Sequence, residues 1–197
     1  VSEQGHSALY VGETHPFPDD RAIFSILEGS SVLVVFNNLL DAAHRYSNWE
    51  RDMDAIRING GDLQDLMDVS SSFLQNNVVI VDPALKLLAY TKDIPCDDPI
   101  TVELISHGFH TEENIGKFKL NKRFKPWSEE DGFIVNDTHK ICKYVTIVRS
   151  FKTKSSFSMI IVMMCNIVDP SDYLFDVYDM FASRVEFYAK LDYLGHK

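Results

Sequence analysis

The sequence predicts an α+β fold in which an antiparallel β-sheet is flanked by helices, with a small N-terminal α/β appendage. From residue 62 onward the predicted order is helix, two strands, helices, three strands and a final helix. The two longest strands, predicted at 141–149 and 157–165, are joined by a short polar connection and therefore run antiparallel. Helices before and after the strands can cover one sheet face, which leaves the other face to close over a cavity.

Residues 1–60 are predicted to form the appendage. Leu9 to Gly12 indicates a short strand, and the β-branched run from Val32 to Phe36 indicates a buried strand. Asn37 and Asn38 then begin a helix whose apolar residues recur at steps of three and four. These residues are Leu39, Ala43, Tyr46, Trp49, Met53 and Ile56. Glycine readily ends a helix, so we place the main boundary at Asn59-Gly60-Gly61.

Residues 61–197 are predicted to form the main domain. Asp62 is a good N-cap for a helix that ends near Asn76. The stretch from residue 76 to residue 91, NNVVIVDPALKLLAYT, then predicts two strands joined by a turn in which Asp82 caps the backbone. A short helix ends at Gly108, and Thr111 is a suitable N-cap for the next one.

The C-terminal part of this domain is predicted to be mostly strand. Residues 121–132 are basic and then acidic, which favours a surface loop, and Phe133 to Val135 follows as a short strand. After the two long strands, Asp169 is expected to cap the final helix, with Pro170 in its first turn.

The final helix carries two apolar stripes. One contains Leu174, Tyr178, Phe181, Val185 and Tyr188, and the other contains Val177, Met180, Phe187, Leu191 and Leu194. A helix that packs only on its own domain needs one stripe, so two stripes favour a homodimer through residues 171–194. The interface is then expected to include Leu174, Val177, Tyr178, Phe181, Val185 and Tyr188. The alternative is one wide face that packs inside the domain.

The composition restricts the class of function. The 197-residue chain has a formal net charge of -10, and an acidic surface repels phosphate backbones, so we expect no nucleic-acid contact. The longest apolar run, Met159 to Cys165, is too short to cross a bilayer, so we expect no membrane contact. The cysteines at 96, 142 and 165 are odd in number and widely spaced, which favours a reducing, cytoplasmic setting. The chain begins at Val1 without a signal peptide and ends within a helical pattern, which indicates part of a longer polypeptide.

No motif predicts catalysis, a metal or a cofactor. The Asp82-Pro83 turn lacks the glycines of a phosphate-binding loop. His107 and His110 have a spacing that can hold a metal, but no further ligand follows, and we interpret both as solvated imidazoles at a helix end. Two carboxylates follow Cys96, which disfavours a reactive thiolate.

The segment from Gly61 to Asp93, GDLQDLMDVSSSFLQNNVVIVDPALKLLAYTKD, resembles the sensory region of PucR-type (purine-catabolism-regulator-like) transcriptional regulators. The matching positions are Leu63, Leu66, Met67, Asn77, Asp82, Leu88, Ala89 and Tyr90. The resemblance implies a GAF-like or PAS-like ligand-sensing domain, with a helix-turn-helix DNA-binding domain further toward the C-terminus of such regulators. This sequence has Asn76-Asn77-Val78 where that family often has Asn-Pro.

Together these patterns predict an effector-sensing, dimerising module of a transcriptional regulator. An unknown small molecule is expected between the sheet and the helices at 98–120. Its candidate contacts are Tyr90, Phe109, Trp127, Tyr144 and Met159, each of which is also consistent with core packing. The alternatives are a small, hydrolase-like enzyme of unknown class and a ligand-free structural scaffold.

Overall fold

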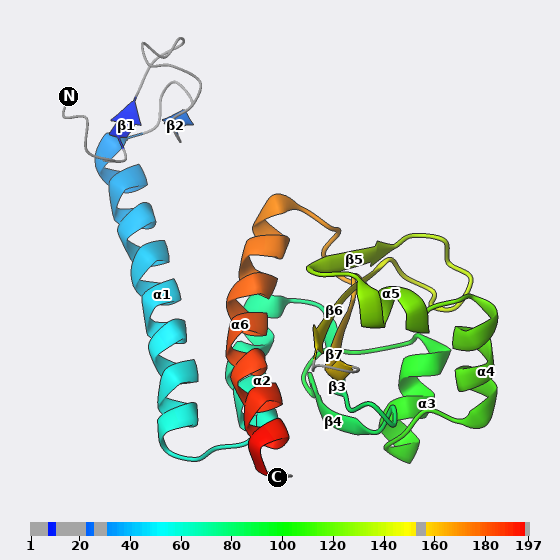
Figure 1. Ribbon diagram of the computed structural model, residues 1–197. Coiled ribbons are helices and arrows are strands. Elements are labelled where there is room, and N and C mark those ends of the chain that lie inside the picture. The colour runs from blue at the N-terminus through cyan, green and yellow to red at the C-terminus, as the bar shows by residue number, and fades with distance from the viewer. Residues whose placement is uncertain (1–7, 11–22, 26–30, 153–156, 196–197) are drawn as a thin grey trace. The chain divides into compact units, whose positions relative to one another are not determined.

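The computed structural model describes residues 8–10, 23–25, 31–152 and 157–195 (Figure 1). The chain divides into two compact units, Val1–Asn48 and Trp49–Lys197. The first unit contains β1 (Ala8–Tyr10) and β2 (Ile23–Ser25), which pair in parallel. The helix α1 (Val32–Ile58) begins in the first unit and ends in the second, so the division between these compact units falls inside α1.

The start of α1 differs from the strand predicted at residues 32–36. The amide of Val35 donates to the carbonyl of Ser31 at 3.1 Å, so helical bonding is already present where a strand was expected. Leu33 and Phe36 are 67% and 49% exposed, not buried. A five-residue apolar run has too few positions to distinguish the period of a strand from that of a helix, which explains the error.

The described residues of the second unit form five strands and, besides the end of α1, five helices. In chain order they are α2 (Leu63–Leu74), β3 (Asn77–Val81), β4 (Leu87–Tyr90), α3 (Pro99–His107), α4 (Glu112–Leu120), α5 (Phe124–Glu129), β5 (Phe133–Asn136), β6 (Thr146–Lys152), β7 (Phe157–Met164) and α6 (Asp172–Gly195). The strands form one sheet in the order β4-β3-β7-β6-β5, and all neighbours are antiparallel. The predicted α+β fold with an antiparallel sheet is therefore confirmed.

Helices cover both faces of this sheet. The helices α2 and α6 lie side by side on one face, and α3, α4 and α5 lie on the other (Figure 1). Side chains on a strand alternate between faces, so Val78 and Ile80 point toward α2 and α6, whereas Val79 and Val81 point toward α3–α5. All four are buried, as expected for the central strands of a three-layer domain.

Local signals in the sequence set several element boundaries. Asp62 and Asp65 form a reciprocal capping box at the start of α2, and Gly60 ends the preceding helix with φ of +75°. Asp82 accepts from the amide of Lys86 at 2.8 Å and so closes the β3–β4 turn. Thr111 caps α4 by accepting from the amide of Asn114. All four of these cap and turn assignments were predicted.

Three boundaries in the C-terminal half differ from the prediction. The expected loop at 121–132 contains the helix α5, with Pro126 tolerated in its first turn. The long strand predicted from Ile141 begins only at Thr146, which pairs with Asn136, the last residue of β5. Ser171, not Asp169, caps α6 by accepting from the amide of Leu174 at 3.2 Å.

The outer edge of β4 is occupied by other parts of the chain. The amide of Leu87 donates to the carbonyl of Gly108 at 2.8 Å. The side-chain amide of Gln64, on α2, accepts from the amide of Tyr90 at 3.1 Å and donates to its carbonyl at 2.9 Å. Both ends of this edge strand are therefore hydrogen-bonded on the side away from β3.

The apolar face of α6 packs inside its own unit. Leu174, Val177, Tyr178, Phe181 and Val185 are each at most 2% exposed. Tyr178 donates to the carbonyl of Ile147 on β6, and the half-buried Tyr188 donates to the carbonyl of Gly61. Of the second predicted stripe, Val177 shares this buried face, whereas Met180 and Phe187 are half-buried. Five of the six residues expected at a dimer interface are therefore buried by intramolecular packing, because the sheet and α2 already cover that face, and the sixth, Tyr188, is half-buried.

Candidate ligand cavity

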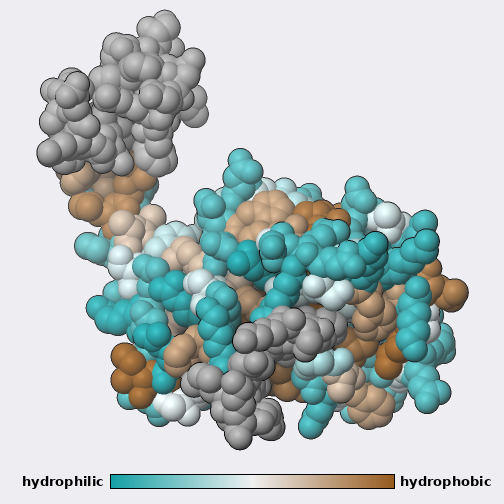
Figure 2. Space-filling model, viewed as in Figure 1, coloured by the Kyte–Doolittle hydropathy of each residue, from teal (hydrophilic) through white to brown (hydrophobic). Residues whose placement is uncertain are grey.

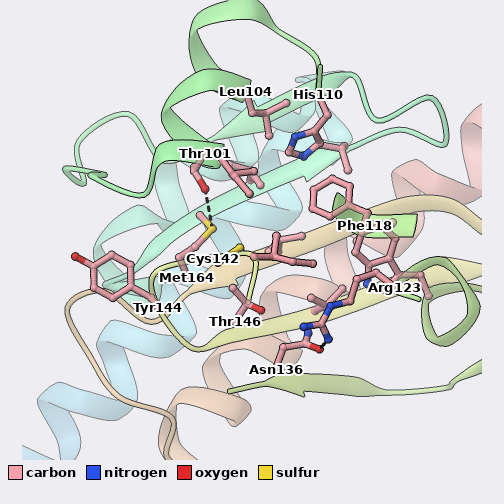
Figure 3. Close-up of a pocket in the computed structure, with 18 of the residues that line it drawn as sticks. Thr101, Leu104, His110, Phe118, Arg123, Asn136, Cys142, Tyr144, Thr146 and Met164 are labelled. Atoms are coloured by element: carbon pink, nitrogen blue, oxygen red, sulfur yellow. Dashed lines mark hydrogen bonds between the residues drawn. The ribbon is translucent and has the colours of Figure 1, made fainter. Parts of the chain in front are cut away.

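A cavity lies between the sheet and α3–α5, on the face opposite α6 (Figure 3). The cavity has a volume of about 60 Å³, which is several times the volume that one water molecule needs. Its wall comes from β3, β5, β6, β7, the helices α3–α5, the adjoining 108–111 and 121–123 segments and the loop at 137–145. A sequence expectation is thereby met, because the terminal helices cover one face and the other face encloses a cavity.

The floor of the cavity is apolar. Strand alternation brings side chains of β3, β6 and β7 to the same face, where they join a buried cluster with residues of α3, α4 and α5. The strand residues are Val79, Val81, Val148, Ile160, Val162 and Met164, and the helix residues are Ile100, Leu104, Phe118 and Trp127. This surface favours the apolar part of a ligand.

Aromatic rings form a row along one wall. The ring of His110 lies edge-on to Phe118 with centroids 4.9 Å apart, and Phe118 lies edge-on to Trp127 at 5.5 Å. Phe124 packs against the other side of Trp127 at 5.3 Å. Each contact has the tilted geometry that aromatic pairs favour, so the wall is held by packing.

His110 is held in place by the backbone. Its amide donates to the carbonyl of Leu85 at 3.0 Å, and the preceding residue, Phe109, bridges to Lys86. Burial lowers the pKa of His110 to about 4, with Glu103 opposing that shift, so the ring is neutral at pH 7. The prediction of a solvated imidazole is wrong for this residue, because the backbone turns at Gly108, after α3, and the His110 side chain lines the cavity.

Two buried polar atoms on the cavity wall lack partners. Among the residues that the structure describes, neither Nδ1 of His110 nor Nε1 of Trp127 has a hydrogen-bond partner. Leaving a buried polar group unpaired costs about 1–3 kcal/mol. Trp127 is only 6% exposed and its indole nitrogen is a donor only, so an acceptor supplied from the cavity is the natural partner for it.

Arg123 lies at the start of α5, beside the cavity. Its guanidinium donates to Oδ1 of Asn136 and, at 3.2 Å, to Oγ1 of Thr138 (Figure 3). Both acceptors are neutral. No carboxylate in the described part of the chain forms an ion pair with Arg123. The guanidinium therefore keeps its full positive charge at the cavity wall, with donors to spare.

The loop at 137–145 closes one side of the cavity and is tied at several points. The buried carboxylate of Asp98 accepts from the amide of Lys143 at 2.7 Å and from both the amide and hydroxyl of Thr101. Asp97 pairs with the Lys143 ammonium and accepts from the hydroxyl of Tyr144 at 2.6 Å. Residues 138–140 are exposed and also line the cavity, so this loop forms its entrance.

Two of the five predicted contact residues, Trp127 and Tyr144, line the cavity. The other three do not. Phe109 is 53% exposed because neighbours on an extended segment point to opposite sides, and His110 takes the inward position. Met159 shares its sheet face with Ile161 and Met163, toward α6, and Tyr90 packs against the cluster beside the cavity without lining it.

Sequence reasoning missed the two most polar contributors, His110 and Arg123. Arg123 lies in the basic run that we interpreted as solvated surface, and His110 lies in a pair that we interpreted as a helix end. Arg123 and Trp127 are four positions apart, so on a helix their side chains lie on the same face. This spacing could have placed Arg123 beside a buried aromatic residue, but only if α5 had been predicted as a helix.

Nothing in the described residues points to a metal or a reactive thiol. No group of three His, Cys, Asp or Glu side chains in those ranges could hold a metal ion. Burial raises the pKa of Cys142, on the cavity wall, to about 12, so its thiol is protonated at neutral pH. None of the helices in the described ranges has the length and apolar character needed to cross a membrane.

No protein-family model matches this chain, and no curated protein matches it either. Function therefore has to be argued from the cavity and its surroundings.

Proposed function

We propose that residues 61–197 form the effector-sensing module of a transcriptional regulator, of the kind that the resemblance to PucR-type regulators implies. A small molecule binds in the cavity between the sheet and α3–α5. Binding stabilises one packing arrangement of the domain over others. The proposal includes no catalytic step and no contact of this chain with nucleic acid.

The observation that carries the proposal is a largely apolar cavity with unpaired polar groups on its wall. Ligand sites typically combine an apolar lining with a few converging polar atoms. Here the apolar floor is joined in the lining by Trp127 and His110, each with a buried ring nitrogen that has no hydrogen-bond partner among the described residues, and by Arg123. A scaffold domain without a ligand gains nothing from buried donors that stay unpaired.

The sheet offers a route from the cavity to α6. On β6, Thr146 and Val148 line the cavity, and the residue between them, Ile147, accepts a hydrogen bond from Tyr178 of α6 through its carbonyl. A ligand that moves β6 therefore changes a contact of the terminal helix. This is the element through which we expect the bound state to be transmitted.

Self-association is the second part of the proposal. Because the apolar face of α6 is buried, a homodimer needs a different surface from the one predicted. Exposed apolar side chains gather at the N-terminal end of α1, which shows as brown surface in Figure 2. They are Leu33, Val34, Phe36, Leu39 and Leu40.

Ligand binding is tested by thermal shift with a library of small metabolites. A compound that binds only the native state at 100 times its Kd adds about 2.7 kcal/mol, which raises Tm by roughly 5–10 °C in a chain of this size. The chain has two tryptophans, so the Trp49→Phe variant makes Trp127 the sole fluorescent reporter of the cavity. Bound ligand is expected to change its emission.

Two matched variants decide whether the shift comes from the cavity. Val162→Phe adds volume at the cavity wall and is expected to abolish the shift, whereas Val135→Phe, on the exposed edge strand β5, keeps it. A library that raises Tm for no compound would favour the scaffold alternative. Turnover of a bound compound would favour the enzyme alternative.

A further inference from the structure

The charges on the cavity wall are of one sign. The whole chain has 29 Asp and Glu against 19 Lys and Arg. Yet in the described part of the chain the cavity lining includes Arg123 and Lys140 and contains no aspartate or glutamate. Two acids act on lining residues from outside the lining, Asp98 on Cys142 and Glu103 on His110. The charged side chains that line the cavity itself are cationic, so a bound molecule meets positive charge there.

Arg123 can take a further acceptor. A guanidinium has five N–H donors in a planar fork, and the two contacts of Arg123 are to neutral oxygens of Asn136 and Thr138. Those contacts fix the side chain in position without neutralising it. A guanidinium that is held in place and has no acidic partner matches the two oxygens of a carboxylate. Hydrogen bonds between these two charged groups are about twice as strong as bonds between neutral groups.

Trp127 adds a second donor beside Arg123. The two residues are four positions apart, and the amide of Trp127 donates to the carbonyl of Arg123 at 3.3 Å, so their side chains lie on one face of α5. The indole Nε1 of Trp127 is buried and unpaired within the described residues. An anionic oxygen in the cavity can accept from both groups.

The rest of the lining determines the size and polarity of the remaining part of the ligand. Away from Arg123 the wall consists of branched aliphatic side chains and the edge of the aromatic row. In Figure 3, Leu104 and Phe118 face this part of the cavity. The free space is small, which favours one ring or a short branched chain over a nucleotide or a sugar phosphate.

We infer that the cavity takes a small organic monocarboxylate with an apolar aromatic or branched body, and that its carboxylate binds Arg123 and the indole of Trp127. This inference rests on the proposed function and specifies the chemical class of the effector. Arg123 is then the residue that distinguishes an acid from its neutral analogue.

The test measures Kd by calorimetry for acid and amide pairs with the full chain. The pairs are benzoate with benzamide, phenylacetate with phenylacetamide, and isovalerate with isovaleramide. At least one acid is expected to bind ten times or more tightly than its amide. Arg123→Gln is expected to weaken that acid at least tenfold and to leave its amide unchanged.

Lys125→Gln provides the matched control. It removes the same charge from the same helix, but the Lys125 side chain is 75% exposed and does not line the cavity, so both members of each pair keep their Kd. If Arg123→Gln does not fold, as judged by circular dichroism, the ratio of acid to amide Kd in the parent protein and in Arg123→Lys decides the question.

The outcomes distinguish a failure of the anionic-ligand assignment from a failure of the proposed sensing function. Equal binding of an acid and its amide, unaffected at position 123, overturns the assignment of an anionic ligand and leaves a sensing cavity in place. If neither these compounds nor any metabolite of the thermal-shift library binds, the proposed function fails and this inference fails with it.

Discussion

At the scale of single residues, the surroundings of His110 lead to a testable prediction about stability. It is neutral, packed edge-on against Phe118 and fixed through its amide, while the neighbouring His107 is half exposed at the end of α3. Two histidines three positions apart thus have different surroundings, because His107 is the last residue of α3, whereas His110 lies beyond Gly108, which ends the helix with φ of +77°.

The low pKa of His110 predicts a loss of stability in mild acid. The folded-state pKa of about 4 lies below the ordinary value of 6.5, so the unfolded chain takes up a proton first as the pH falls. The free energy of unfolding should be unaffected by this group above pH 6.5 and should decrease between pH 6.5 and 4, by up to about 3 kcal/mol. Urea denaturation across this range measures the slope.

Substitution assigns that slope to one side chain. His110→Gln is expected to flatten it, because no imidazole remains to be protonated in the unfolded chain. His107→Gln, a change of the same kind at an exposed position, is expected to keep it. Identical slopes in the parent protein and in His110→Gln would contradict the assignment.

At the scale of elements, the N-terminus of α3 and the loop at 137–145 depend on the same carboxylate. Asp98 is fully buried, caps α3 through Thr101 and holds the loop through the amide of Lys143. One side chain thereby joins two walls of the cavity that are far apart in the sequence.

We predict that Asp98→Ala destabilises the protein by at least about 2 kcal/mol, since it removes a helix cap and leaves the buried amide of Thr101 and the part-buried amide of Lys143 without their acceptor. It should also weaken any ligand that stabilises the parent protein, because the loop loses its anchor. Chemical denaturation and the thermal-shift assay measure these effects. Asp97→Ala is the control, because that carboxylate is exposed and a smaller loss is expected. Equal losses for the two variants would show that burial of Asp98 does not matter.

The same scale shows how far the sequence could predict the fold. Elements with chemical start and stop signals were located well, among them α2 with its capping box and the β3–β4 hairpin with Asp82 in its turn. Elements without such signals were not. The helix α5 has no side-chain cap. The side chains of Ile141, Cys142 and Tyr144, which predicted a strand, line the cavity and do not belong to the sheet.

The candidate site was predictable only in part, for a related reason. A large aromatic residue such as Trp127 is expected inside whatever the fold, and that expectation placed it at the cavity. The orientation of His110 and Arg123 depends on residues distant in the sequence, including Leu85, Asn136 and Thr138. Local patterns contain no information about those partners.

At the scale of the whole molecule, the two compact units differ in how their apolar side chains are used. In the second unit Trp49 is 2% exposed, stacks on Phe73 at 4.4 Å and donates to the hydroxyl of Ser70. In the first unit, the described part of α1 leaves Leu33, Phe36 and Leu40 exposed, at helical steps of three and four.

We predict that the chain forms a dimer through this part of α1. Replacing Leu33 and Leu40 with Gln should convert the dimer to a monomer, because the exposed stripe is what two copies can bury against each other. Light scattering over a range of concentrations gives the mass. Leu120→Gln, at an 84% exposed leucine in the second unit, should leave the mass unchanged. A parent protein that is monomeric at every concentration contradicts the prediction.

The hydrogen bonds along the outer edge of β4 have a consequence for solubility. An unpaired edge strand is a template on which a foreign strand can add, and from there fibrils can grow. Here the Gln64 side chain and the carbonyl of Gly108 occupy the positions that an incoming backbone needs. The buried, valine-rich strand next to this edge is thereby shielded from intermolecular pairing for as long as α2 stays docked.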